Sequence, residues 1–241
     1  MKYVIGDIHG EISKLKLLIE IICKNDNLPE FIFIGDYIDK GENSKKTLDH
    51  LDELRKNYKC IFLIGNHEYL WKNASNNKNY LFKYGAISTI NSFGFKSIEE
   101  TQTYILRKYE NLFNLFVDYY QIDSYLIVHS GIQPEYYLID DVINIPTESF
   151  LFNRYSFLQV EQYFQNKYKI IFGHTAFYEP YRDIYKIGID TAACYINSQP
   201  LTAFCIDENI FYNSHNKKYS LEYLPENSCA NIVRKKPSLI L

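Results

Sequence analysis

Five short segments of this chain place Asp, His or Asn beside glycine, and these are residue types that bind divalent metal ions or transfer protons. The segments are Gly6-Asp-Ile-His-Gly10, Gly35-Asp-Tyr-Ile-Asp-Lys-Gly41, Gly65-Asn-His-Glu68, His129-Ser-Gly131 and Gly173-His-Thr175. A pair of divalent cations about 3.5–4 Å apart needs ligands from several such segments, including one carboxylate that contacts both ions. The segments therefore predict one shared site with two metal ions and hydrolytic chemistry.

The spacing of these residues assigns them to the two ions. Asp7 and His9 are two residues apart in a glycine-flanked turn, so both side chains can face the first ion. Asp36 follows the neighbouring predicted strand and is the natural bridge between the ions. The candidates for the second ion are Asn66, His129 and His174. Two cations bring four positive charges and two aspartates return two negative ones, so the surplus would attract a phosphate dianion and acidify a bridging water molecule.

A proton donor is also expected at this site. His67 follows Asn66 directly and is placed to protonate a leaving oxygen atom. A general acid of this kind contributes ~10²–10⁴ in rate. Asp39 could hold the His67 ring in the correct tautomer and raise its basicity, as carboxylates behind catalytic histidines do.

Each of the five segments follows a short apolar run that is typical of a buried strand. The runs are Tyr3–Ile5, Phe31–Ile34, Cys60–Ile64, Tyr125–Val128 and Lys169–Phe172. Between the first three runs, residues 12–24 and 44–57 repeat apolar side chains with helical period, and Ser44 is a candidate cap for the second helix. The first half therefore reads β-α-β-α-β, which favours a parallel sheet with its ligands at the carboxyl ends of the strands.

The remaining segments carry weaker patterns. We expect an exposed loop over 72–80, a helix over 99–120, and a terminal β-meander formed by 186–190, 201–206 and 210–212 that extends a second sheet. Residues 225–241 show no clear pattern and are expected to form a loosely packed tail. No linker rich in Gly, Ser or Pro divides the chain, so we expect a single domain over residues 1–241.

The composition excludes several classes of protein. The net charge of −3 over 241 residues provides no basic surface for a nucleic acid. No apolar run approaches the ~20 residues of a membrane-spanning helix, and the first strand begins too early to leave room for a signal peptide. The five cysteines are an odd number without CxxC spacing, which is typical of reduced thiols. We therefore expect a cytoplasmic protein without nucleic-acid or membrane partners.

In their order along residues 3–206, the five segments resemble the signature of the metallophosphoesterases, and most closely the phosphoprotein phosphatase (PPP) family with its small bacterial and phage-type members. The resemblance implies an α/β (α+β sandwich) calcineurin-like fold, in which two mixed sheets are flanked by helices and the dimetal site lies at the carboxyl ends of the strands. It implies the same ligands and the same roles for His67 and Asp39 as the residues suggest. It adds Arg154, in Phe152-Asn-Arg154, as a phosphate-binding arginine.

Two positions depart from the pattern of that family. The second segment usually ends Asp-Arg-Gly, whereas here Lys40 replaces the arginine, keeping its charge but losing the planar fork that binds phosphate through two nitrogens. Lys40 remains a candidate phosphate-binding residue. Protein phosphatases often carry arginine before Gly-Asn-His-Glu, but here that residue is Ile64, and relatives that cleave dinucleoside polyphosphates also lack it. Asp190, in Gly-Ile-Asp-Thr, resembles a family segment as well, and we interpret it as a structural turn residue.

The resemblance favours a serine/threonine protein phosphatase that uses a metal-bridging hydroxide as nucleophile and acts on a phosphorylated protein or peptide. One alternative is a hydrolase of phosphoanhydrides such as diadenosine tetraphosphate. Another is a non-catalytic scaffold that binds phosphate. The cofactor expected is two divalent ions, with Mn²⁺ preferred and Fe²⁺ or Zn²⁺ open, because Asp, His and Asn ligands suit all three.

Overall fold

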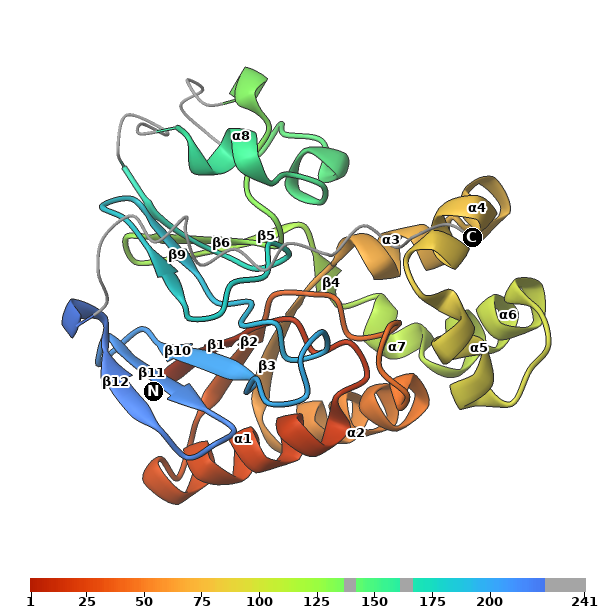
Figure 1. Ribbon diagram of the computed structural model, residues 1–241, viewed down its shortest axis with the longest axis horizontal. Coiled ribbons are helices and arrows are strands. Elements are labelled where there is room, and N and C mark those ends of the chain that lie inside the picture. The colour runs from red at the N-terminus through yellow and green to blue at the C-terminus, as the bar shows by residue number, and fades with distance from the viewer. Residues whose placement is uncertain (137–141, 161–166, 224–241) are drawn as a thin grey trace.

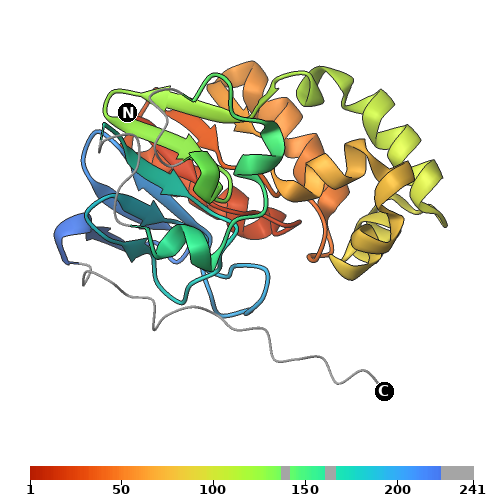
Figure 2. The same cartoon turned by 90° about the horizontal axis from the view of Figure 1, so that it is seen from above.

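The computed structural model describes residues 1–136, 142–160 and 167–223, and the following statements refer to these residues. Two sheets lie face to face, and helices cover their outer faces (Figure 1). Helices α1 (Ile12–Asn25) and α2 (Ser44–Asn57) lie along the larger sheet, and α8 (Tyr155–Leu158) lies beyond the smaller one. A further group of helices extends from one end of the sandwich (Figure 2). This is the fold of two mixed sheets flanked by helices that the sequence predicts.

The larger sheet has seven strands in the order β12-β11-β10-β1-β2-β3-β4. Their bounds are β1 Lys2–Ile5, β2 Glu30–Phe33, β3 Lys59–Leu63, β4 Phe116–Val117, β10 Thr202–Cys205, β11 Ile210–Asn213 and β12 Lys218–Ser220. Strands β1 to β4 are parallel, whereas β10, β11 and β12 join antiparallel beside β1. The parallel strands consequently all end at one edge of the sheet.

The smaller sheet has five strands in the order β5-β6-β7-β9-β8. Their bounds are β5 Tyr119–Ile122, β6 Tyr125–Val128, β7 Lys169–Phe172, β8 Tyr181–Arg182 and β9 Lys186–Gly188. Strands β6, β7 and β9 are parallel to one another. Both sheets therefore contribute a set of parallel strands, and each set brings its carboxyl ends together.

The other helices connect these strands. They are α3 Asn66–Lys72, α4 Ala74–Lys83, α5 Ala86–Phe93, α6 Ile98–Lys108 and α7 Glu110–Phe113. Among the described residues, short 3₁₀ helices cover Pro134–Tyr136, Thr147–Phe150 and Leu221–Tyr223. No helix among the described residues is both long enough and apolar enough to cross a bilayer.

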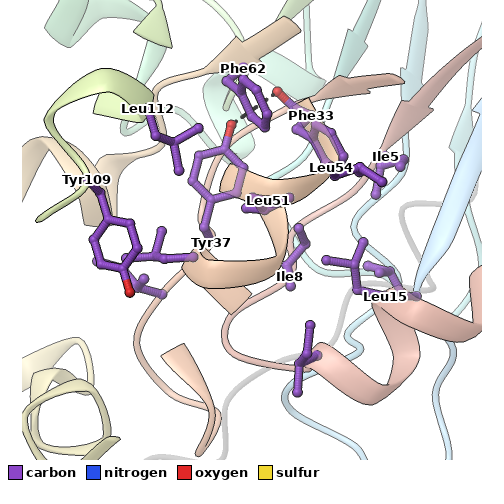
Figure 3. Packing of buried hydrophobic residues seen from close by; sticks show 14 of the residues in the cluster. Ile5, Ile8, Leu15, Phe33, Tyr37, Leu51, Leu54, Phe62, Tyr109 and Leu112 are labelled. Carbon is purple, nitrogen blue, oxygen red and sulfur yellow. Dashed lines mark hydrogen bonds between the residues drawn. The ribbon is translucent and has the colours of Figure 1, made fainter. Parts of the chain in front are cut away.

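Because side chains alternate between the two faces of each strand, the larger sheet has a separate hydrophobic core on each face. Tyr3 and Ile5 of β1 face α1 and α2, whereas Val4 between them faces the second sheet. On the helical side, Tyr37 packs among the rings of Phe33 and Phe62 (Figure 3), and its hydroxyl donates to the carbonyl of Leu63 over 2.6 Å. The loop that follows β2 is thereby anchored to the end of β3, which fixes its position at the sheet edge.

Two predictions of secondary structure are wrong. The expected loop over 72–80 is largely helix α4, in which Ala74 and Leu81 are buried, and this tertiary packing outweighs the poor helix propensity of its three asparagines. The expected helix over 99–120 ends at Phe113, because Phe116 and Val117 pair with the open edge of β3.

The terminal meander and the helix cap also differ from expectation. Residues 202–205 pair with β1 and so extend the first sheet, and within the expected meander 186–188 alone joins the second. The N-cap residue of α2 is Asn43, which precedes the helix, and the Ser44 hydroxyl instead accepts a hydrogen bond from the Asp39 amide over 3.1 Å. The tail expected over 225–241 lies outside the described residues. That the whole chain forms one domain stays a prediction.

Candidate metal centre

The five segments with Asp, His or Asn meet where the parallel strands of both sheets end. Within the smaller sheet, the Gly173 amide donates to the His129 carbonyl over 2.8 Å, which joins the loops after β6 and β7. The His174 amide donates to both carboxylate oxygens of Asp7, over 3.1 and 3.0 Å. The six predicted ligands are all buried, and they are Asp7, His9, Asp36, Asn66, His129 and His174.

Asp36 stands at the middle of this cluster. Its Oδ2 is 3.3 Å from His9 Nε2, and its Oδ1 is 3.4 Å from His129 Nε2. Two sets of side chains have donor atoms that all lie within 4.8 Å of one another, one made of His9, Asp36 and His67 and the other of Asp36, His129 and His174. Asp36 is the member that both sets share. This is the arrangement required of a carboxylate that contacts two ions.

Backbone carbonyls fix the orientation of two of the histidine rings. His9 Nδ1 lies 2.9 Å from the Ile38 carbonyl, and His129 Nδ1 lies 2.8 Å from the Ile34 carbonyl. Since a carbonyl oxygen accepts hydrogen bonds, each Nδ1 carries the proton and each Nε2 presents its lone pair to Asp36. Hydrogen bonding of this kind is typical of histidines that bind metal ions.

The protonation states also suit metal binding. Burial, and after it the positive charge of Lys40, lowers the pKa of His9 to about 4. Burial also lowers the pKa values of His129 and His174, so all three rings are neutral at pH 7 and each can bind a cation through its unprotonated nitrogen. Burial alone would raise the pKa of Asp36, but the surrounding histidines outweigh it and hold that pKa well below its usual value.

The donor set is incomplete without a cation. Asn66 Oδ1 lies 3.1 Å from His129 Nε2, and because His129 Nδ1 carries the proton, both of these atoms are acceptors. Two buried acceptors facing each other repel unless a cation lies between them. On the other side of Asp36, the Lys40 ammonium lies 2.6 Å from His9 Nε2, so a positive charge already faces that lone pair. The residues present therefore fit a pair of cations.

Asp7 is buried at the edge of this arrangement. Its Oδ2 is 3.9 Å from His9 Nε2, but it belongs to neither set of mutually close donors. Burial, followed by the charges of Asp190 and Asp36, raises the pKa of Asp7 well above its usual value. Several carboxylates thus share a buried volume whose negative charge a bound cation would offset.

Three of the predicted ligands, together with Asp39 and Lys40, adopt left-handed backbone conformations that residues other than glycine rarely take. The φ angles are 47° at His9, 54° at Asp36, 68° at Asp39, 65° at Lys40 and 63° at His174. Such conformations cost on the order of 1–3 kcal/mol each and persist where the surrounding structure imposes them, most often at functional sites. The backbone of these loops therefore adopts the conformations that direct their side chains into the site.

His67 and Asp39 form a fully buried pair behind Asp36. His67 Nδ1 is 2.7 Å from Asp39 Oδ2, and His67 Nε2 is 3.8 Å from Asp36 Oδ2. Asp39 also accepts hydrogen bonds from Trp71 Nε1, over 3.0 and 3.1 Å, and from Thr89 Oγ1 over 2.6 Å. These donors hold the carboxylate in place, so the ring it orients presents Nε2 to the centre of the site.

Lys40 and Arg154 both lie beside the cluster. The Lys40 ammonium contacts His9 and also stands 4.8 Å from the centroid of the Tyr195 ring. Arg154 donates from Nη1 to the His174 carbonyl over 2.9 Å, and its side chain is part-buried. The two cationic side chains predicted to bind phosphate are thus placed by contacts with different histidines of the cluster.

Glu68 has a structural role that the sequence motif does not predict. Glu68 is fully buried, and its Oε2 accepts hydrogen bonds from the amides of Asp36 (2.9 Å) and Gly65 (3.2 Å), while Oε1 accepts from Tyr37 (2.9 Å). Burial and the charge of Asp36 raise its pKa to about 8. Glu68 stands three residues after Gly65, the N-cap residue of α3. A glutamate at this position commonly caps the start of a helix, and this signal could have identified Glu68.

Comparison with known proteins gives a consistent result. Residues 3–210 match the family model described as calcineurin-like phosphoesterase. The chain is 32% identical over 148 residues to the catalytic subunit A2 of serine/threonine-protein phosphatase 2B from Saccharomyces cerevisiae, covering 59% of this chain and 21% of that protein. It is 25% identical over 136 residues to a symmetrical bis(5'-nucleosyl)-tetraphosphatase from Pseudomonas putida, covering 56% of this chain and 44% of that protein. The matches span less than half of each of these relatives.

Solved structures share the fold at low sequence identity. A cold-active protein-tyrosine phosphatase from a Shewanella species superposes with a TM-score of 0.59 at 13% identity, over 91% of this chain and 80% of that one. A putative diadenosine tetraphosphatase gives a TM-score of 0.53 at 16% identity, over 88% of this chain and 91% of that one. These likenesses support the fold.

Proposed function

This chain belongs to the calcineurin-like phosphoesterase family, whose model matches residues 3–210, and we propose that it is a metal-dependent phosphomonoester hydrolase, specifically a serine/threonine protein phosphatase. The observation that carries the proposal is the position of Asp36, whose two oxygens face His9 on one side and His129 on the other. A carboxylate shared in this way is the feature that a two-metal hydrolase requires.

The proposed ligands divide around Asp36. Asp7 and His9 would hold the first ion with Asp36, and Asn66, His129 and His174 would hold the second with it. When bound, the two ions would lower the pKa of a water molecule and neutralise phosphoryl oxygens. We propose Mn²⁺ as the metal, with Fe²⁺ and Zn²⁺ as alternatives, because mixed oxygen and nitrogen ligands suit these ions.

The remaining steps belong to the side chains of the protein. His67 would donate a proton from Nε2 to the leaving alkoxide of the substrate, while Asp39 keeps the second proton of the ring on Nδ1. The guanidinium of Arg154 would bind phosphoryl oxygens, and the Lys40 ammonium would bind one more as a point charge. Burial of the six proposed ligands, His67 and Asp39 limits the access of bulk water, which strengthens the electrostatic interactions among them.

A phosphorylated protein or peptide is the preferred substrate on grounds of charge. A phosphomonoester has three terminal oxygens, which two ions and two cationic side chains can satisfy, whereas a dinucleoside polyphosphate presents a longer anionic chain and two bases. The net charge of −3 provides no general attraction for such a chain. The relatives include both a protein phosphatase and a dinucleoside tetraphosphatase. Protein phosphatases often carry an arginine where this chain has Ile64, and this difference favours the second candidate, a phosphoanhydride hydrolase.

A panel of substrates tests the proposal. We expect the purified protein to hydrolyse p-nitrophenyl phosphate, to lose that activity in EDTA and to regain it with Mn²⁺. We expect kcat/KM to be at least about tenfold higher on phosphoserine or phosphothreonine peptides than on diadenosine tetraphosphate, which corresponds to about 1.4 kcal/mol. The reverse ranking would make it an anhydride hydrolase. Metal binding without hydrolysis of any substrate would make it a phosphate-binding scaffold.

We also propose a cytoplasmic location. Cys23, Cys60, Cys194 and Cys205 are free thiols in the structure, as a reducing compartment would keep them. Cys229 lies outside the described residues.

A further inference from the structure

Asp190 carries a buried carboxylate oxygen without a hydrogen-bond partner. The residue is 3% exposed, its Oδ1 accepts from the Ala192 amide over 3.0 Å, and its carbonyl accepts from the Phe177 amide over 2.9 Å. Its Oδ2 has no partner among the described residues. Leaving a carboxylate oxygen buried and unpaired is unfavourable, so this atom calls for an explanation.

The position of Asp190 suggests what the missing partner is. A Cβ atom on Gly6 would lie 2.5 Å from the Ile189 carbonyl, so the two backbones touch immediately before Asp7 and Asp190. The Ile189 amide donates to the Phe172 carbonyl over 2.9 Å, which holds this segment against the end of β7. The electrostatic effect of Asp190 on Asp7 is consistent with the same proximity. Asp190 therefore lies beside the ligands proposed for the first ion.

The interpretation of Asp190 as a turn residue explains one of its two carboxylate oxygens, Oδ1. The bond from the Ala192 amide to Oδ1 is the bond of a turn in which an Asp side chain caps its own backbone, and an asparagine oxygen would make it equally well. Neither the turn nor the bond from Phe177 requires Oδ2 or a negative charge. Burial raises the pKa of Asp190, and its unpaired buried Oδ2 needs a different reason.

We propose that Asp190 is an additional anionic residue of the first cation site, where its Oδ2 accepts a hydrogen bond from a water molecule that this cation holds. Asp190, like Asp7, belongs to neither set of mutually close donors, so the number of ions that a variant binds distinguishes a role through water from direct ligation. The inference rests on the two-ion site proposed above. Removing a carboxylate that supports a metal site in this way typically costs 10–100-fold in metal affinity.

Asp190→Asn is the matched substitution, because the amide keeps the Oδ1 acceptor of the turn and removes the charge. The control is Asp207→Asn, which changes the net charge by the same amount. Asp207 lies at the opposite end of β1, where it accepts a hydrogen bond from the Lys2 amide over 2.6 Å. Mn²⁺ would be titrated calorimetrically into metal-free wild type and both variants. We expect two ions at saturation in all three proteins, with one of them bound about 10–100-fold more weakly in Asp190→Asn.

Three outcomes separate this inference from the function on which it rests. Equal Mn²⁺ affinities in wild type and Asp190→Asn would overturn it, and so would a variant that saturates with one ion, since Asp190 would then be a direct ligand. Failure of the wild type to bind two ions would instead reject the two-metal function. Should Asp190→Asn not fold, a structure of the Mn²⁺-loaded wild type decides: Oδ2 must lie within hydrogen-bond distance of a water molecule on the ion.

Discussion

Both sides of the candidate metal centre contain a histidine ring oriented by a backbone carbonyl, that of Ile38 for His9 and that of Ile34 for His129. The two sides differ in the groups beside these rings: on the second-ion side, made of Asn66, His129 and His174, the Asn66 oxygen faces His129 Nε2. The first-ion side, made of Asp7 and His9, is surrounded by further charges. The Lys40 ammonium contacts His9, and the backbone just before Asp190 touches the backbone just before Asp7.

This difference indicates where the free energy of metal binding is expected to come from. On the second-ion side, the ligands are already positioned and a cation would relieve the repulsion of two acceptors. On the first-ion side, a cation must displace or rearrange an ammonium before it reaches His9, while it gains the attraction of buried carboxylates. We therefore expect the two ions to bind with different affinities and to respond differently to substitution.

Asp36→Asn should have the largest effect, because this carboxylate belongs to both sides. We expect kcat/KM to fall by about 10³-fold or more, since losing several kcal/mol of charge stabilisation by the ions corresponds to that factor. The measurements are steady-state kinetics and metal content by mass spectrometry, with Asp207→Asn as the control of equal charge. A variant that keeps both its activity and two bound ions would exclude the shared role of Asp36.

His67→Asn tests whether the third histidine near Asp36 belongs to the metal sites or acts as a proton donor. Its Nε2 is 3.8 Å from Asp36 Oδ2, which is compatible with either role. As a proton donor it should lower kcat by ~10²–10⁴ on a phosphoserine peptide while metal content stays constant. The loss should be smaller on p-nitrophenyl phosphate, whose leaving group needs no proton. Equal losses on both substrates, or a loss of metal, would reject the role of general acid.

The pH dependence of the metal-free protein tests the electrostatics of the first-ion side. The pKa of His9 is about 4, below the usual value of 6.5, so the unfolded state binds more protons between these two pH values. Stability should therefore fall as the pH is lowered from 6.5 to 4, by about 3 kcal/mol for this one group. Urea unfolding in EDTA should show a steeper loss for wild type than for His9→Gln. Parallel pH profiles would mean that His9 is not held neutral.

The sequence predicted the ligand cluster because each ligand directly follows a strand, and parallel strands bring their ends together. It could not assign residues 202–205 to the correct sheet, since an antiparallel strand can join any open edge and β1 happened to offer one. Helix α4 was missed because burial of Ala74 and Leu81 depends on partners distant in sequence.

Glu68 has a role that its motif does not show, and Asp190 has an oxygen that its predicted turn does not use. Both residues lie against other segments of the chain: Glu68 accepts from the Asp36 amide, and the segment of Asp190 contacts the backbone of Gly6 through Ile189. A motif places such a residue at its own strand end, but it does not show which amide or charge the side chain will meet. That information arises when the two sheets pack together, as in the contact between Gly6 and Ile189.

Lys40 gives the smallest expected effect and the sharpest comparison between the two sides, because its ammonium faces the lone pair of His9 that the first ion would use. Lys40→Met should strengthen binding of one Mn²⁺ ion about tenfold, since a competing positive charge worth about 1.4 kcal/mol at a partly screened site is removed. The same variant should raise KM for phosphopeptides, since a phosphate-binding charge is lost.

Lys40→Arg is the matched control, because it keeps the charge and restores the planar fork. It should retain or improve phosphopeptide activity if this position binds phosphate. Calorimetry with Mn²⁺ and steady-state kinetics on a phosphothreonine peptide measure the two effects separately. If Lys40→Met changes KM but leaves the affinities of both Mn²⁺ ions unchanged, the ammonium moves away from His9 when the first ion binds and does not weaken its binding. The two sides of the centre would then differ in their carboxylates alone, and Asp190→Asn would become the substitution that tells them apart.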